Sequence, residues 1–397
     1  MSYANNWLGP AAIVMALTVG IGVPAGVQSQ SSGPADLAVL ASGWLDPVSG
    51  RAQGPAAILV AGEKIVRIVA ANAFDAKSAR TVIDLGNATV LPGLIDAHVH
   101  LQIGGQPGDN ARAALGAGFT TLVDLGATSD VVLRLRDAIA AGTVEGPRIL
   151  AAGLWAGTKN GICEFGGIGV AGGPEGFRAR VRENVAAGAD LTKVCVSGWT
   201  AAAFAQPDAY EISDEALKAV VDESTSAKRM VVAHAISLGS ARAASRAGVR
   251  GLAHAAFLDS STAAELRDRE IFLVPTLQTL TRTPGPATDA LRKAVVMAHR
   301  AGVRLVFGTD GGVLPHGKNA AEFRALVDAG LQPIDTIRAA TINAAHVFGL
   351  GDAIGTLGEG KFADIIAVDG DPLTDIGAME RVIFVMRHGR VFRSQAR

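Results

Sequence analysis

The chain has 397 residues, of which 49% are hydrophobic and only 18% are charged, so it can bury a large core and is not a disordered protein. Its 36 basic and 37 acidic residues give a formal net charge of −1, with no basic stripe or tail. This charge pattern argues against nucleic acid as a partner.

The N-terminal segment differs in composition from the rest of the chain. Residues 8–25 are apolar and small, and the sequence VPA ends at Ala25. This pattern predicts a secretory signal peptide over residues 1–25, followed by a flexible lead-in at 26–35, and hence a periplasmic or secreted protein without a stable membrane span in its mature form. No Lys or Arg precedes Arg51, so the alternative is a disordered or anchoring N-terminus on a cytoplasmic protein.

The two ends of the remaining chain share a strand-like pattern. Residues 36–90 contain AAILVAGEKIVRIVA and ARTVIDLGNATVL, and residues 360–397 contain FADIIAVDG and RVIFVMRHGRVFR. Strand-forming residues in these segments are separated by Gly, Asp and Asn turns. We expect one small composite β-sandwich domain built from both chain ends.

Residues 91–359 alternate between helical and strand-like patterns. An Ala-Gly pair, as at Gly118, Gly188, Gly248 and Gly302, repeatedly ends a helical stretch just before an apolar run. The fold class predicted is α/β, a (β/α)8 TIM barrel, whose chemistry lies at the C-terminal ends of its strands. The expected strands are 94–100, 121–125, 148–152, 191–196, 230–235, 251–257, 272–277 and 304–310.

Polar side chains lie in or at the ends of these apolar strands. His98 and His100 end the first strand and, being two residues apart, point to the same face. The fifth, sixth and eighth strands carry His234, His254 and Asp310. Single buried histidines are usually packing residues, but imidazole and carboxylate groups that converge at one barrel mouth are suitable ligands for zinc and similar ions.

Lys193, in the fourth strand, is the unusual member of the set. A buried ammonium group beside metal ions would be repelled and poorly solvated. Neutral lysine can instead add carbon dioxide and become a carbamate, an anion that can bridge two metals. Cys195 shares the face of Lys193; Cys163 and Cys195 could form one disulfide, but we expect two buried thiols.

The ordered set of motifs resembles the metal-dependent amidohydrolase superfamily, in its imidazolonepropionase-like and Xaa-Pro dipeptidase-like branch. The matching segments are LPGLIDAHVHL, GADLTKVCVSG, VVAHA, GLAHAAFLD, FGTDGGVLPHG and AATINAAHVFGLGDAIGTLGEGKFADIIAVDGDPL. The resemblance covers about residues 36–395 and implies two divalent metal ions, with zinc expected. The roles it implies are first-metal ligands His98 and His100, carboxylated bridging Lys193, second-metal ligands His234 and His254, ligand and general base Asp310, and substrate-binding His316 and Tyr210.

The resemblance implies hydrolysis of an amide bond in a small-molecule substrate, such as a dipeptide or an N-acyl amino acid, by a hydroxide that bridges the metals. An ester, lactone or phosphotriester hydrolase could use the same residues. A deaminase is less favoured because Lys193 is present and no Glu follows His234 closely. A catalytically dead relative is also disfavoured, because every ligand is retained. The substrate stays open, since Ala253 and the loop GTKNGICEFGGIGVAGG depart from the family pattern. Whether the protein forms a homo-oligomer also stays open.

Overall fold

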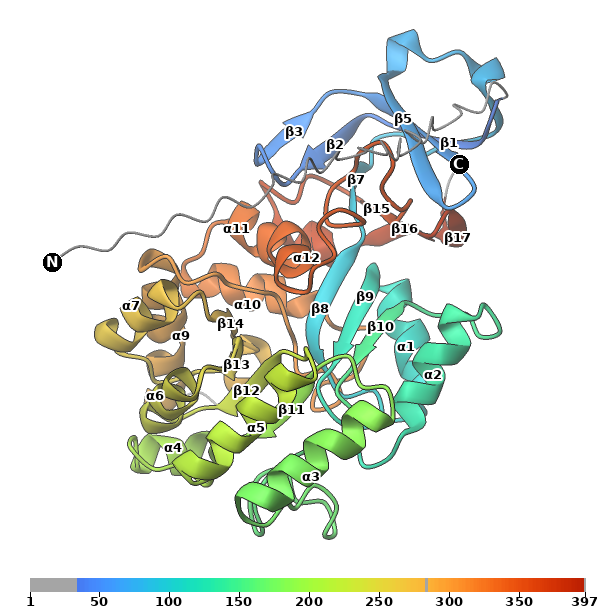
Figure 1. Ribbon diagram of the computed structural model, residues 1–397. Helices are drawn as coiled ribbons and strands as arrows, with labels where there is room; N and C mark the ends of the chain where they lie inside the picture. The colour runs from blue at the N-terminus through green and yellow to red at the C-terminus, as the bar shows by residue number, and fades with distance from the viewer. Residues whose placement is uncertain (1–33, 283–284, 396–397) are drawn as a thin grey trace, which may run out of the picture.

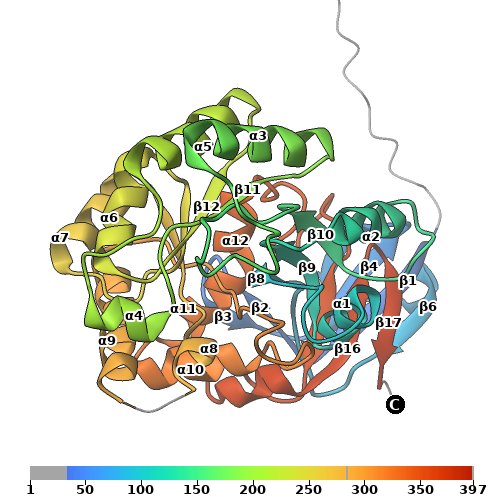
Figure 2. The same ribbon diagram turned by 90° about the horizontal axis from the view of Figure 1, so that it is seen from below.

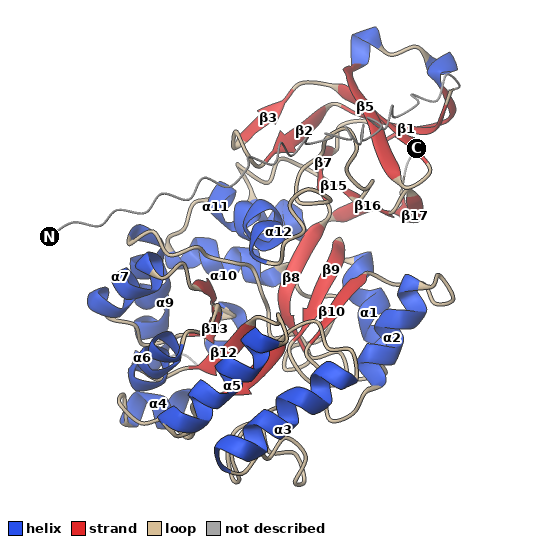
Figure 3. Ribbon diagram, viewed as in Figure 1, coloured by secondary structure: helices blue, strands red, loops and turns tan. Residues whose placement is uncertain are grey.

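The computed structural model describes residues 34–282 and 285–395. The predicted signal peptide lies outside the described residues, as does most of the lead-in. Within the described part, no helix is both long and apolar enough to cross a membrane. The molecule combines β-sheets at one end with an α/β region at the other, and Figures 1 and 3 show this division.

Strands from both chain ends lie together in the β-rich part. One sheet has the order β5-β4-β1-β6, and a second, six-stranded sheet has the order β17-β16-β15-β7-β2-β3, so C-terminal strands pair with N-terminal ones. The strands are β1 (Ala35–Ala41), β2 (Gly43–Asp46), β3 (Arg51–Gln53), β4 (Ala56–Ala61), β5 (Lys64–Ala70), β6 (Ala79–Asp84), β7 (Thr89–Pro92), β15 (Ile365–Val368), β16 (Val382–Arg387) and β17 (Arg390–Ser394). Short helical turns here are η1 (Ala71–Ala73), η2 (Ala76–Ser78) and η4 (Ile376–Glu380).

A shared apolar core joins these two sheets. Val39 and Ile58 of the first sheet belong to the same buried cluster as Val90, Ile365 and Phe384 of the second. In β1, β4 and β16, alternate residues on one face of the strand belong to this cluster. Strand β7 pairs with β15 in this part and is followed directly by β8, the first strand of the α/β region. The first two predicted ligands lie at the end of β8.

The α/β region contains two parallel sheets. Their orders are β10-β9-β8 and β11-β12-β13-β14. The strands are β8 (Leu94–Val99), β9 (Phe119–Asp124), β10 (Arg148–Ala151), β11 (Thr192–Cys195), β12 (Val231–Ala235), β13 (Gly251–His254) and β14 (Phe272–Val274). Seven of the eight predicted strands are therefore present, with ends that differ by a few residues.

The expectation of a regular eighth strand at 304–310 is wrong. Only isolated bridges form here, from Leu305 to Leu273 and from Gly311 to Val99. The segment still connects the two sheets, because the Val306 amide donates to the Leu273 carbonyl (2.8 Å) and the Asp310 amide donates to the His98 carbonyl (2.7 Å).

The helices of this region are α1 (Pro107–Gly116), α2 (Val131–Ala140), α3 (Gly173–Ala186), α4 (Thr200–Ala205), α5 (Asp214–Ser226), α6 (Leu238–Ala247), α7 (Ser260–Asp268), α8 (Leu277–Leu280), α9 (Pro286–Arg300), α10 (Ala321–Ala329), α11 (Pro333–Arg338), η3 (Ala339–Asn343) and α12 (Ala344–Val347). Most of them surround the strands, as Figure 2 shows, whereas α12 lies near the middle of that view. Helix α6 shows how capping residues in the sequence mark the ends of a helix. The Ser237 side chain caps its start, and Gly248 ends it in the left-handed conformation at φ 92°.

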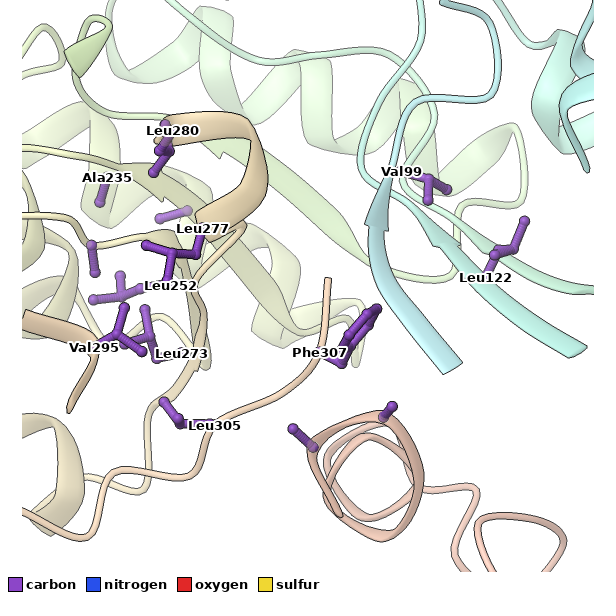
Figure 4. Packing of buried hydrophobic residues seen from close by; sticks show 14 of the residues in the cluster. Val99, Leu122, Ala235, Leu252, Leu273, Leu277, Leu280, Val295, Leu305 and Phe307 are labelled. Carbon is purple, nitrogen blue, oxygen red and sulfur yellow. The ribbon is translucent and has the colours of Figure 1, made fainter. Parts of the chain in front are cut away.

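Helix and strand side chains form one large core. Val99, Leu122 and Phe307 belong to the same buried cluster as Leu252 and Leu273, and Figure 4 shows this packing. Because strands β8, β11, β12 and β13 are buried along their whole length, polar side chains within them have no access to bulk water. They need partners inside the protein.

Candidate metal centre

Three predicted ligands meet where β8 ends. The Nε2 atoms of His98 and His100 each lie 3.3 Å from Asp310 Oδ1, and they lie 3.3 Å from one another. All three residues are buried. The structure thus brings two imidazoles and a carboxylate from opposite ends of the α/β region into one small cluster.

His234 on β12 and His254 on β13 extend this cluster. Their ring centroids are 4.5 Å apart, and the His254 ring lies 5.1 Å from that of His98. One ligand atom from each of His98, His254 and Asp310 falls within 4.8 Å of the others. The two parallel sheets therefore bring all four predicted histidines into one cluster.

Lys193 on β11 completes the set. Its side chain is fully buried, with Nζ 3.5 Å from His98 Nε2. Burial lowers the pKa of Lys193 to about 7, although the carboxylates of Asp310 and Asp124 act in the opposite direction. An amine with such a pKa is neutral in a large fraction of molecules at neutral pH.

Burial favours the uncharged form of three of the histidine rings. Burial lowers the pKa of His234 to about 3, and burial together with Lys193 lowers the pKa of His98 well below its ordinary value. Burial and the His234 ring lower the pKa of His254 in the same way. Neutral imidazole is the form that binds metals.

The donor set fits divalent metal ions. His234 Nε2 and His98 Nδ1 are buried without a hydrogen-bond partner in the protein, which is a costly state for a polar atom in a core. Outer partners orient two other rings: His100 Nδ1 donates to the Gly126 carbonyl (3.0 Å), and His254 Nδ1 is hydrogen-bonded to Thr276 Oγ1 (2.7 Å). Metal-binding histidines are commonly fixed by such contacts.

Unusual backbone conformations help to orient the side chains of the centre. Asp310 has φ 59°, His254 has φ 74°, and Thr276 has φ 49°. Residues other than glycine rarely adopt this left-handed region, and where they do the surrounding structure must hold them. Such residues concentrate at functional sites.

Two buried aspartates that sequence reasoning did not use as site residues support the ligands. The Asp96 carboxylate accepts hydrogen bonds from the amides of His98 and Thr309 (both 3.1 Å), from the Thr309 hydroxyl and from Asn319. Asp124 accepts from the Leu101 amide (2.7 Å) and from the Gly126 amide (3.1 Å). Burial raises the pKa of both carboxyls to about 6. For Asp96, the sequence signal of a supporting role was its position in an apolar strand, two residues before the motif HVH.

Comparison with known proteins agrees with this geometry. The model of the amidohydrolase family matches residues 89–392. The chain belongs to the amidohydrolase family. Ochratoxinase of Aspergillus niger is 28% identical over 91% of this chain and 88% of its own length. The crystal structure of a Xaa-Pro dipeptidase with methionine in its active site is 27% identical, with a TM-score of 0.83. The structure of a prolidase complexed with N-methylphosphonate-L-proline is 28% identical, with a TM-score of 0.78. Each match covers 90% of this chain and 100% of the other chain.

This amidohydrolase is therefore a member of a metal-dependent superfamily and a hydrolase that acts on carbon–nitrogen bonds. The two predicted substrate residues differ in their placement. His316 lies beside the cluster, where its Nε2 donates to the His100 carbonyl (3.3 Å) and its Nδ1 is buried without a partner. Tyr210 is exposed, and its hydroxyl donates to Asp214 Oδ1 (2.9 Å) at the start of α5. Their roles toward substrate stay predictions.

The expectation of two free thiols in this amidohydrolase is wrong. Cys163 and Cys195 form a disulfide, with their Cα atoms 6.2 Å apart. The bond ties the loop after β10 to the end of β11, two residues beyond Lys193. Trp155 packs against both cysteines in a small buried cluster of its own. The loop carries no periodic pattern, which is why the sequence did not indicate the pairing.

Proposed function

We propose that this amidohydrolase cleaves an amide bond of a small molecule, such as a dipeptide or an N-acyl amino acid. The observation that carries the proposal is the convergence of four imidazoles, Asp310 and Lys193 in one buried cluster. The printed names of the relatives, a dipeptidase, a prolidase and an ochratoxinase, support an amide as the substrate.

The residues suit a pair of divalent ions, with zinc expected from the ligand types. His98, His100 and Asp310 would hold one ion, and His234 and His254 the other. Lys193 would bridge them as a carbamate, formed when its neutral amine adds carbon dioxide. When bound, such ions supply an acidified water molecule and an electrophile for the carbonyl oxygen.

Asp310 would move the protons. Its Oδ1 lies 3.3 Å from the Nε2 atoms of both His98 and His100, and its amide donates to the His98 carbonyl. Hydrolysis adds one water across the C–N bond: the oxygen goes to the carbonyl carbon, a proton goes to the Asp310 carboxylate, and the leaving nitrogen takes that proton as the bond breaks. His316 would contact the substrate beside this centre.

We propose a (β/α)8 barrel over residues 91–359 and a composite β-sandwich over 36–90 and 360–397. The hydrogen bonds from segment 304–311 to β14 and β8 support closure on one side. On the other side, the Asp190 amide donates to the Ala151 carbonyl (2.9 Å) and the Cys195 amide to the Ala156 carbonyl (2.8 Å), which links β11 to β10. In such a barrel the ligands lie at the C-terminal mouth.

We also propose export, with cleavage near Ala25. The disulfide supports this, because disulfides persist mainly in oxidising compartments. The intact mass of the protein recovered from outside the cytoplasm should correspond to a chain that begins at Gly26. Recovery of the full-length chain from the cytoplasm alone would contradict export.

The function is tested by measuring release of free amine from dipeptides and N-acyl amino acids, with aryl esters and lactones in parallel, on a sample of known metal content. We expect amide hydrolysis that a chelator abolishes and added zinc restores. ¹³C-labelled bicarbonate should give a carbamate signal that is absent from Lys193→Ala. Turnover of esters or lactones without any amide would overturn the proposal.

A further inference from the structure

The imidazoles of the candidate metal centre continue into aromatic rings that reach the surface. The His100 ring lies 5.3 Å from the buried Trp155 ring, and Trp155 stacks on Phe165 at a centroid distance of 4.4 Å. Phe165 is 41% exposed. An exposed benzyl group therefore lies only one ring away from a predicted metal ligand.

A second exposed ring contacts the other pair of histidines. The Trp199 ring lies 6.3 Å from His234, nearly parallel at 21°, and 6.1 Å from His254. Trp199 is 37% exposed. Phe165 and Trp199 thus stand at the two ends of one continuous series of ring contacts, with the four histidines between them.

The exposure of these rings has an energetic cost that a ligand would remove. Large aromatic side chains on a monomer surface stay in water at the expense of hydrophobic free energy, and a contiguous exposed apolar group commonly marks a binding site. Ile168 (41% exposed) and Val313 (39% exposed) add apolar surface in the loops that follow β10 and Asp310. All four of these exposed apolar residues lie in segments that follow the C-terminal ends of β10, β11 or the 304–311 segment.

The wall that carries Phe165 is held in place. The Cys163–Cys195 disulfide anchors its loop to β11, and Phe165 exchanges backbone hydrogen bonds with Ile168 (2.9 and 3.2 Å). On its far side, the Glu211 carboxylate accepts from the Ile162 amide (3.3 Å). A preformed aromatic wall loses little conformational entropy on binding.

We propose that Trp199 and Phe165 select the substrate, and that the amides cleaved carry an apolar, preferably aromatic, group on each side of the scissile bond. The inference rests on the proposed amide hydrolysis and names the substrate class of that site. With the carbonyl at the histidine cluster, one group packs on Trp199 and the other on Phe165. Ring stacking and burial of the rings supply the preference.

The test uses four related amides: N-(2-naphthoyl)-phenylalanine, N-(2-naphthoyl)-alanine, N-acetyl-phenylalanine and N-acetyl-alanine. For the wild type, each aromatic group should raise kcat/KM roughly tenfold, mainly through KM. Trp199→Ala should remove the preference on one side of the amide and Phe165→Ala that on the other, while Trp199→Phe keeps most of it. Phe204→Ala is the matched control, because Phe204 is 47% exposed and contacts Phe257 rather than the histidines. Thermal unfolding and metal content verify that each variant is folded and loaded.

A binding measurement separates this inference from the proposed function. Calorimetric titration should show 2-naphthohydroxamic acid binding the metal-loaded wild type at least about tenfold tighter than acetohydroxamic acid, with the difference lost in the double variant Trp199→Ala/Phe165→Ala. That result without turnover of any amide would support the aromatic walls and overturn amide hydrolysis. Amide turnover with equal kcat/KM for all four substrates would overturn the inference and leave the proposed function standing. Variants that lower kcat/KM by the same factor for every substrate would do the same.

Discussion

Removal of the disulfide should destabilise the folded protein by a predictable amount. Cys163 and Cys195 are separated by 32 positions in the sequence, and the segment between them includes α3 and most of β11. In the chain-entropy model, the cross-link of a loop of this length restricts the unfolded ensemble by about 3–4 kcal/mol at 25 °C. The double variant Cys163→Ser/Cys195→Ser should lose roughly that free energy of unfolding.

Urea denaturation of the two proteins, followed by circular dichroism, measures this difference. The reduced wild type should unfold at the same urea concentration as the double variant, and the oxidised wild type should unfold at a higher one. Thiol titration of the denatured, unreduced protein should find no free thiol, and reduction should release both. Equal unfolding free energies for the oxidised and the reduced wild type, or two titratable thiols without reductant, would refute the reasoning.

Three further predictions concern buried groups around the centre. Asp96→Ala leaves several buried donors without an acceptor, so urea denaturation should show a loss of about 3–5 kcal/mol; an effect below 1 kcal/mol would contradict it. Burial raises the pKa of Glu322 from 4.5 to about 8, so the folded protein holds a proton that the unfolded chain releases. Its contribution to stability should fall by about 1.4 kcal/mol per pH unit between about pH 5 and 8, and Glu322→Gln should flatten that part of the curve; identical curves would disprove the assignment. Gly126→Ala places a Cβ 2.3 Å from the Trp155 ring, so tryptophan fluorescence should change and stability should drop by about 1–3 kcal/mol, whereas an unchanged spectrum would show that the ring is not held there.

Much of the centre was predictable because it follows strand periodicity. The two-residue spacing of His98 and His100, and the placement of His234 and His254 at the ends of neighbouring strands, are direct consequences of the parallel arrangement. The Ala-Gly pairs likewise marked helix ends correctly, as at Gly248. Site residues that lie on regular strands, and helix ends marked by glycine, can therefore be predicted from the spacing of residues in the sequence.

The features that were missed depend on contacts without such a pattern. The eighth segment is irregular where Gly308 approaches β8: a Cβ there would lie 2.9 Å from His98 Cβ, and Asp310 takes a left-handed conformation two residues later. The partner of Cys195 sits in a loop whose path is fixed by tertiary contacts. Asp96 serves four donors that only the folded chain brings together.

The most direct test of the centre is the metal content of the purified protein and of its Lys193→Ala variant, measured by inductively coupled plasma mass spectrometry. The wild type should retain about two divalent ions per chain, and the variant should lose at least one of them together with most of the activity. Lys218→Ala is the control, since that lysine is exposed and forms an ion pair with Asp222, away from the centre. A Lys193→Ala protein that is folded and keeps the full metal content would contradict the bridging role of Lys193.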